Sequence, residues 1–461
     1  MAYNFLPYDQ DQLYLMPPDL SEWVAESSLA RFVSEVVEQL EAEGELEIFY
    51  SPYRADGWGR AAYHPRMMVK VILYGYCCGV TSSRRIARAL ENDIAFRFLS
   101  ANQQPDFRTV SDFRKDHLAA LEALFIDVLR LCQSAGLAKM GRVALDGRKV
   151  AGNAALDQNR AKDAIEKEVA RILAEAERVD AEEDEKYGPD RRGDELPEEL
   201  RTREGRLKRL KEARARLEAE ARQARQRQEQ KIEARRQDEE ESGRKKRGRK
   251  PKSAEDAVNT EAKANITDPQ SRIMKTRRGW LQGYNGQAMA DCDSQVIVAQ
   301  DVTQAENDVN QLAPMLEVCE AQAGRRPEEA LADAGYWSEE NAGLENETTE
   351  LFIATIKDWK QRKELKEKGA PRGPIPKDAT ARDRMERKLL TRRGKKIYKQ
   401  RGSTIEPVFG QMAMRGLNRI WLRGINGAKG EWSLWCTTHN LLKLWRSGYQ
   451  PLCAGAMAPG S

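Results

Sequence analysis

Histidine is scarce in this chain, and its cysteines follow no metal-binding pattern. Only three histidines and seven cysteines occur among 461 residues, and no two cysteines have the CxxC spacing. Zinc sites need nitrogen and sulfur ligands at such spacings, so we expect any bound metal to be held by oxygen. The number of cysteines is odd, and apart from the adjacent Cys77 and Cys78 they lie far apart. This pattern indicates reduced, mostly buried thiols.

Long apolar runs are also missing. The longest run, Val71–Val80, is too short to span a bilayer, and the sequence does not open with a basic start, an apolar stretch and a cleavage site. We therefore expect a cytoplasmic protein with no membrane partner.

Charge is plentiful but unevenly placed. The net charge is only +4, although 33% of the residues are charged. The segment Arg382–Arg401 holds ten basic and two acidic residues, and Arg244–Lys252 holds no acid. Dense basic tracts in a nearly neutral chain favour a polyanionic partner over simple surface solvation. We therefore expect nucleic acid as the partner, and no small-molecule substrate.

The first 140 residues have the apolar spacing of helices. Pro65 is expected to start one helix and Gly79 to end it, and Ser82 or Ser83 then caps a second helix. The pair resembles a helix-turn-helix whose second helix carries Arg84 and Arg85 as DNA contacts. Two packed helices that bind no DNA explain the pattern equally well.

After residue 140 the pattern predicts an α/β domain. Short apolar or alternating segments indicate strands, a helical period lies between the third and fourth of them, and a later helix carries Glu406. The expected strands are Val143–Asp146, Tyr284–Ala290, Gln295–Gln300, Ala330–Asp333 and Leu351–Ile356, and the helix between them is Val309–Ala323.

Residues 156–260 interrupt this pattern with high charge density and no strand signal. Apolar residues from Ile165 to Val179 keep a 4-3-4-3 rhythm, and leucines from Leu200 to Leu217 partly continue one after several helix breakers. We predict an inserted, coiled-coil-like helical hairpin. It is either a solvated arm without a specific role or a protrusion that binds DNA or another subunit.

Three carboxylates are candidates for a shared site. Asp146 and Asp333 each end a predicted strand, and Glu406 is expected near the start of a late helix. Small residues follow both aspartates, where backbone must approach a ligand closely. Three such oxygen donors can hold two Mg²⁺ ions, for which Mn²⁺ can substitute, during in-line phosphoryl transfer. This chemistry needs no histidine, cysteine or covalent nucleophile.

Eight segments spread over nearly the whole chain carry a family pattern. In chain order they read NFLPYDQDQLYLMPPDL, YHPRMMVKVILYGYCCGVTSSRRIARAL, PDFRTVSDFR, VALDGRKVAGNAA, TDPQSRIMK, GYNGQAMAD, ADAGYWS and RGSTIEPVFGQM. Together they resemble bacterial insertion-sequence transposases with a DDE, RNase H-like core, closest to the eleven-eighty-two group. Several motifs in one order are far more specific than any single motif.

The resemblance implies DNA strand cleavage and strand transfer at the ends of an insertion sequence. It assigns Asp146, Asp333 and Glu406 as the metal-binding catalytic acids, and Tyr398 and Arg401 as residues of the same motif. The spacing from Arg401 to Glu406 is one residue longer than the usual pattern, and the family's basic residue seven positions after the glutamate is Ala413 here.

The expected organisation has four parts. Residues 1–140 form a helical DNA-binding or dimerisation domain, 141–155 and 261–448 form a mixed-sheet RNase H-like core, 156–260 form the charged hairpin with its basic linker, and 449–461 form a disordered tail. The expected partners are double-stranded DNA, as transposon ends and target, and a second copy of the chain in a homodimer on the bacterial nucleoid. The expected DNA contacts beyond the helix pair are Lys149, Tyr398, Arg401, Arg392, Arg393, Lys395, Lys396, Arg247 and Arg249.

Two points stay open at this level. Arg247 and Arg249 belong to a segment that resembles an AT-hook but is interrupted by Lys250, so a basic linker that touches phosphates without reading bases is favoured. A DNA-binding regulator that has lost catalysis, or a nuclease or resolvase with the same fold, is the alternative function. A structural coiled-coil protein would explain only residues 156–260.

Overall fold

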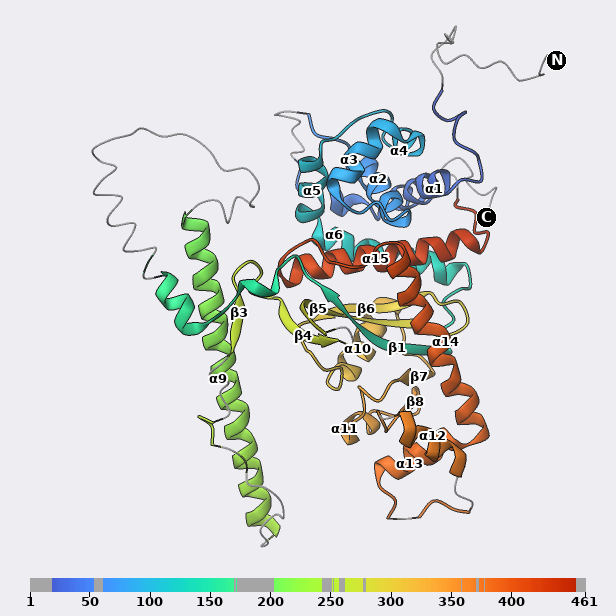
Figure 1. Cartoon of the computed structure of the whole chain (residues 1–461). Coiled ribbons are helices and arrows are strands. Elements are labelled where there is room, and N and C mark those ends of the chain that lie inside the picture. Colours follow the sequence, from blue (N-terminus) through green and yellow to red (C-terminus); the bar gives the residue numbers. More distant parts are fainter. Residues whose placement is uncertain are drawn as a thin grey trace, which may run out of the picture.

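The chain combines a helical layer, a mixed sheet and a projecting arm (Figure 1). The computed structural model describes residues 19–53, 61–169, 171, 203–242, 251, 253–256, 262–276, 279–357, 359–369, 373–376 and 378–452. The predicted α/β class is confirmed. Within these ranges no helix is long and apolar enough to cross a membrane. The six cysteines in the same ranges are free thiols and four of them are buried.

The N-terminal part is helical, as predicted. Its elements are α1 (Leu29–Ala42), the short 3-10 helix η1 (Glu47–Tyr50), α2 (Pro65–Cys77), α3 (Ser83–Asn92), α4 (Ile94–Leu99), α5 (Phe107–Asp116) and α6 (Leu118–Ser134). Pro65 occupies the first turn of α2, and Gly79 follows this helix with a φ of +77°. Ser82 is the N-cap residue of α3. The turn chemistry read from the sequence therefore sets both helix ends.

A six-stranded sheet forms the centre of the molecule. Its strands are β1 (Arg142–Ala151), β4 (Arg272–Thr276), β5 (Gly279–Asp291), β6 (Ile297–Thr303), β7 (Glu329–Ala332) and β8 (Glu350–Ile353). Strands β4, β5, β1, β7 and β8 are neighbours in that order, and β6 also pairs with β5. Strand β1 is antiparallel to β5 and parallel to β7, so it joins an antiparallel half to a parallel half.

The strands differ from the predicted ones mainly in length. Strand β1 continues five residues beyond Asp146, because Gly147–Ala151 pairs with β5 although it lacks an apolar alternation. Strand β4 was not predicted, since its charged sequence RIMKT gives no strand signal. The helix α10 (Leu312–Ala323) begins three residues later than expected.

The C-terminal part is again helical. Its elements are α11 (Glu339–Ala342), α12 (Trp359–Lys368), α13 (Ala381–Leu390), α14 (Arg392–Met414) and α15 (Gly424–Arg446). Thr380 and Asp383 form a reciprocal capping box at the start of α13, and Thr391 caps α14. These two caps explain why the basic tract divides into two helices.

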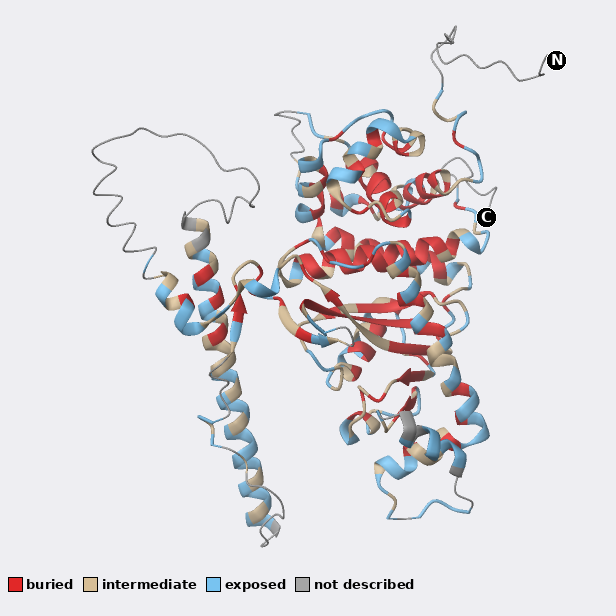
Figure 2. Cartoon of the chain, viewed as in Figure 1, coloured by how far each residue is buried: buried red, intermediate tan, exposed pale blue. Residues whose placement is uncertain are grey.

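Helix α15 lies between the helical layer and the sheet (Figure 1) and is buried along most of its length (Figure 2). Trp432 and Trp435 are fully buried. Tyr76 of α2 packs edge-on against Trp435, and Trp432 donates from its indole N–H to the backbone oxygen of Gln287 in β5 at 3.2 Å. The helix therefore joins both layers into one core.

The arm departs from a small second sheet, one strand of which lies within residues 156–260, where no strand was expected. After the 3-10 turn η2 (Leu156–Gln158), strand β2 (Asn159–Ala161) pairs with β3 (Lys263–Asn265), and Ala161 lies opposite Lys263. Between these strands the described residues include a helical segment, 162–169, and the long helix α9 (Arg203–Ser242). The distal part of α9 is largely exposed (Figure 2).

A separate apolar cluster packs the two helical segments of the arm together. Ile165, Leu210 and Leu217 are buried in it, with Val169 and Leu207 packed against them. These are residues of the two predicted apolar rhythms. The intervening residues 172–202 lie outside the described part of the chain, so the complete hairpin stays a prediction.

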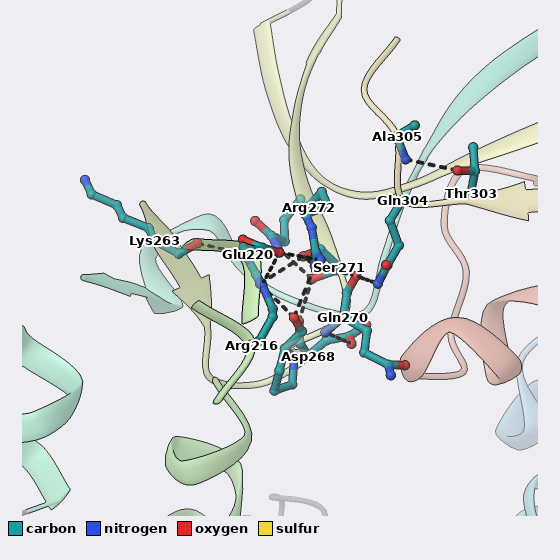
Figure 3. Close-up of polar contacts among 12 residues, drawn as sticks. Arg216, Glu220, Lys263, Asp268, Gln270, Ser271, Arg272, Thr303, Gln304 and Ala305 are labelled. Carbon is teal, nitrogen blue, oxygen red and sulfur yellow. Dashed lines mark hydrogen bonds and ion pairs between the residues drawn. The ribbon is translucent and has the colours of Figure 1, made fainter. Parts of the chain in front are cut away.

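Polar contacts fix the arm to the sheet (Figure 3). Arg216 of α9 donates to the backbone oxygens of Pro269 at 2.7 Å and Lys263 at 3.0 Å. Arg272 of β4 forms an ion pair with Glu220 of α9 at 2.6 Å. Both arginine side chains are mostly buried, so these contacts hold the arm at a defined position on the body.

Packing of α15 on β5 gives a first prediction. A Cβ added at Gly286 would lie 2.8 Å from three ring atoms of Trp432, which is fully buried. We expect Gly286→Ala to destabilise the protein by about 1–3 kcal/mol through overpacking. Gly410→Ala is the control, because that helical position has no neighbour within 4 Å and the change should stabilise by up to about 1 kcal/mol. Urea unfolding midpoints that shift equally for both variants would contradict the packing.

Candidate active site

Asp146 and Asp333 occupy matching positions on adjacent parallel strands. The β1–β7 register pairs Ala144 with Leu331; Asp146 lies two residues further along β1, and Asp333 lies two residues further along the chain, just beyond the end of β7. Neighbouring strands are about 4.8 Å apart, so this register brings the two carboxylates to one edge of the sheet. The sequence predicted that both acids end their strands: Asp333 directly follows β7, but Asp146 lies within β1, which continues to Ala151.

Arg401 of α14 connects the first aspartate to the glutamate. Its guanidinium donates to Asp146 Oδ2 at 3.1 Å and to Glu406 Oε1 at 3.2 Å. The side chain of Asp146 is 22% exposed, whereas that of Glu406 is 64% exposed. The three acids therefore reach one region of the molecule, with Glu406 at its outer side and a cation between Glu406 and Asp146.

The local electrostatics disfavour a charged Asp146. Burial and the charge of Asp333 raise the pKa of Asp146 to about 6, against the opposing effect of Arg401. The same carboxylate also accepts a hydrogen bond from the backbone N–H of Gly147 at 2.8 Å. Two carboxylates in a partly buried site thus carry more negative charge than one arginine offsets.

Glu406 lies in the middle of α14, and the predicted position near a helix start was wrong. Glycine and proline both disfavour a helix interior, yet α14 runs through Gly402 and Pro407. Proline has no N–H to donate to the carbonyl of Ser403. The Gln295 side-chain amide donates to that carbonyl instead, at 3.1 Å. A tertiary contact from the β5–β6 turn thus satisfies the helix next to the glutamate.

A second polar group beside the aspartates was missed by the sequence reasoning. Asp308 accepts hydrogen bonds from the amides of Asn285 at 2.7 Å and Gln287 at 2.8 Å, and the Tyr336 hydroxyl donates to Gln287 Oε1. Buried polar residues within the apolar strand β5 were the available signal. Asn285 Oδ1 is buried and has no hydrogen-bond partner among the described residues.

The two glycines of the predicted motifs keep this region open. A Cβ on Gly147 would lie 2.6 Å from Asp308 Oδ1 and 2.9 Å from Asn285 Oδ1. A Cβ on Gly335 would lie 2.7 Å from Asp333 Oδ1. Glycine is therefore required at both positions for the carboxylates to approach the strand ends closely.

The donor set fits a divalent cation that prefers oxygen. Asp146, Asp333 and Asp308 offer carboxylates, and their mutual repulsion is what a cation would relieve. In the described residues, however, no three His, Cys, Asp or Glu side chains already form a metal-binding group. Arg401 takes part of that electrostatic role by bridging Asp146 and Glu406.

The predicted DNA-contacting residues of α14 have different environments. Arg392, Lys395 and Lys396 are exposed. Arg393 forms ion pairs with Glu329 and with Glu350 Oε2, the latter at 2.6 Å, which ties α14 to β7 and β8. Its partners give Arg393 a structural role that the charge count did not reveal.

The remaining predicted contacts are dispersed. Tyr398 is half-buried on α14, Lys149 on β1 donates to the backbone oxygen of Lys275 at 3.0 Å, and Arg84 and Arg85 are exposed on α3. Arg247 and Arg249 lie outside the described residues. Ala413 lies in the last turn of α14 and Arg415 is its C-cap residue, directed inward onto the ring of Trp435. Arg415 therefore does not replace the basic residue expected at position 413.

The raised pKa of Asp146 gives a second prediction, for protein without metal in a chelator. Because the folded-state pKa of about 6 exceeds the ordinary value of 3.8, ionising Asp146 destabilises the fold. The penalty is absent below about pH 4, develops as the pH rises towards 6 and is complete above it. We expect Asp146→Asn to be more stable than the parent at pH 7.5 by on the order of 2 kcal/mol, and equally stable near pH 4.

Urea unfolding between pH 4 and pH 8 measures this difference. Asp293→Asn, an exposed carboxylate in the β5–β6 turn, is the control and should follow the parent. A stability difference for Asp146→Asn that does not change with pH would contradict the electrostatic account.

Comparison with known families adds independent information at both ends of the chain. A family model described as a transposase domain (DUF772) matches residues 18–116, which contain helices α1–α5. A model described as a transposase DDE domain matches residues 365–445, which contain Arg401 and Glu406. No curated protein and no solved structure matches the chain. The two matches, together with the mixed α/β fold, support an insertion-sequence transposase with a DDE domain.

Proposed function

We propose that this protein is a DNA transposase that cleaves DNA strands at the ends of an insertion sequence and transfers them to a target. The observation that carries the proposal is the convergence of Asp146, Asp333 and the Arg401–Glu406 pair at one edge of the sheet. The three acids are the catalytic residues of this proposal. Membership of the eleven-eighty-two group is part of it and rests on the sequence motifs alone.

The strand arrangement supports an RNase H-like core. The order β6-β5-β1-β7-β8, with an antiparallel half followed by a parallel half, agrees with the mixed sheet that the sequence motifs imply. We assign this core to 141–155 and 261–448, and the DNA-binding or dimerisation domain to 1–140. The charged hairpin at 156–260 is the insertion, and the tail begins at 449.

We propose two Mg²⁺ ions, or Mn²⁺ in their place, as the cofactor held by Asp146, Asp333 and Glu406. When bound, such ions supply Lewis acidity and charge neutralisation for phosphoryl transfer. The chain itself positions the acids, through the backbone N–H of Gly147 at Asp146 and the backbone N–H of Gly335 at Asp333, 2.7 Å from its Oδ1. Arg401, no longer needed between two carboxylates, would then contact a phosphate.

The proposed partner is double-stranded DNA, bound by a homodimer. Exposed Arg84, Arg85, Arg392, Lys395 and Lys396 support it, because cations on helices are the usual source of phosphate contacts. Lys149, Tyr398, Arg401, Arg247 and Arg249 complete the proposed set, and nucleoid association in the bacterial cytoplasm follows from the same partner.

The third prediction is that substitutions at the three acids abolish DNA cleavage without abolishing DNA binding. Alanine at Asp146, Asp333 or Glu406 removes negative charge near phosphate together with a metal ligand. End-binding should therefore persist or tighten, while strand cleavage falls by orders of magnitude. The assay incubates each variant with the element ends and Mg²⁺ and maps cleaved strands, with Asp293→Ala as the control that keeps cleavage. Parental cleavage by Asp146→Ala would exclude the assignment of the acids.

The fourth prediction concerns the exposed cations of α14. Replacing Arg392, Lys395 and Lys396 together by glutamine should weaken DNA binding and reduce its salt dependence by about one unit of slope per lost phosphate contact. Arg393→Gln should instead lower stability slightly, because it removes one of the two cations that pair with each of Glu329 and Glu350. Gel-shift titrations across salt and thermal melts separate the two effects. An unchanged salt slope in the triple variant would show that these residues of α14 do not contact DNA.

A further inference from the structure

A groove of about 770 Å³ opens where the helical layer, the end of β1 and the base of the arm meet. Helices α3 and α5 form one wall, and the segment Trp421–Arg423 before α15 forms the opposite wall. Arg209 of α9 closes it on the arm side. We call this space the interdomain groove. It is separate from the three acids and was not indicated by the sequence.

The lining of the interdomain groove is strongly basic. It includes Arg84, Arg114, Lys115, Arg209 and Arg423, and none of the described residues that line it is an aspartate or glutamate. Lys115 and Arg209 pair with carboxylates three residues away on their own helices, at 3.1 and 3.3 Å. Such surface pairs are worth only a few tenths of a kcal/mol, so a phosphate can replace them readily.

Two large aromatic side chains stand exposed at this groove. Phe107 is 38% exposed and Trp421 is 44% exposed, although both line the space. The guanidinium of Arg84 lies 5.2 Å from the ring centre of Phe107, and that of Arg419 lies 5.6 Å from the ring of Trp421. Alternating cations and exposed rings are typical of nucleic-acid surfaces, where rings contact sugars or bases and cations contact phosphates.

Buried hydrogen bonds hold the two walls in fixed relation. Arg114 of α5 donates to the Tyr76 hydroxyl at 2.8 Å and to the backbone oxygen of Thr81 at 2.9 Å. The same hydroxyl donates to Glu431 of α15 at 3.2 Å, and Glu431 accepts the backbone N–H of Trp421 at 2.7 Å. The groove is therefore preformed, and a ligand would bind without ordering its walls.

We propose that the interdomain groove binds the sugar-phosphate backbone of the DNA end whose cleavage occurs at Asp146 and Asp333. Strand β1 links the two places, because Ala151 at its end pairs with Arg419 just before Trp421. Five residues of strand separate Asp146 from Ala151, or about 17 Å. This corresponds to about five base pairs at 3.4 Å each. The groove thus contacts the same duplex within one helical turn of the scissile phosphate.

The proposal rests on the proposed function, and its test uses binding rather than cleavage. Fluorescence anisotropy measures the affinity of the full chain for an element-end duplex in a chelator, over a range of salt. Lys115→Gln/Arg423→Gln should lower the salt slope by about two and weaken binding about 25-fold at 0.15 M salt, because each phosphate contact contributes about fivefold there. Trp421→Ala should weaken binding without changing the slope, since it removes an uncharged contact.

The matched control is Arg326→Gln. Arg326 is also an ion-paired arginine, bound to Glu320 at 2.7 Å, but it precedes β7 at the end of that strand opposite Asp333. It should bind DNA like the parent. Hydroxyl-radical footprints should lose protection about five base pairs from the cleavage position in the double variant only. Thermal melts verify that each variant is folded.

If the folded double variant binds DNA with the same affinity and the same salt slope as the parent, the groove assignment is wrong, whatever the cleavage assay shows. Cleavage of element ends by the parent, together with such unchanged binding, would leave the transposase function standing without the groove. A lower salt slope in the double variant, combined with no cleavage by the parent, would support the groove but not the transposase function. The groove would then bind DNA in a protein that lacks the proposed chemistry.

Discussion

The burial of helix α15 on two sides is the constraint on which the rest of the structure depends. One face packs under the helical layer and the other on the sheet, so its polar residues must find partners inside the protein. Asn440 accepts from the backbone N–H of Ile297 and donates to its oxygen, each at 2.8 Å. Burial lowers the pKa of His439 to about 3, so its ring stays neutral while bonded to the Gln295 backbone. Nearer the other end of α15, Glu431 accepts the backbone N–H of Trp421. These internal contacts hold α15 between the helical layer and the sheet.

Stability and chemistry oppose each other at the sheet edge. Asp146 and Asp333 lie on neighbouring strands because the parallel register puts them there, and burial makes their repulsion costly. Arg401 offsets part of this cost without removing it. A site that would be more stable with one neutral side chain but keeps two acids is typical of functional rather than structural carboxylates.

The sequence predicted what local patterns encode and missed what only packing creates. Asp146 and Asp333 could be found because a short apolar run precedes each of them, and the α2–α3 turn because proline and glycine mark it. Glu406 was misplaced in its helix, because the contact that makes Pro407 tolerable comes from Gln295, more than a hundred residues away. The interdomain groove could not be predicted from the sequence for the same reason. Its walls come from α3, α5, α9 and the segment before α15, and no single segment carries its pattern.

The pairing of β2 with β3 has a consequence for how such a chain can change over generations. Ala161 and Lys263 face each other across two strands, so the chain leaves the small sheet and re-enters it at one point. A genetic insertion or deletion there would alter the length of the projection, which spans about 60 Å in α9 alone, without moving any strand of the main sheet. The contacts at its base that constrain such a change include the arginine contacts and the apolar packing of α9 against β3. The length of the arm can therefore change during evolution while the main sheet that carries the acids keeps its structure.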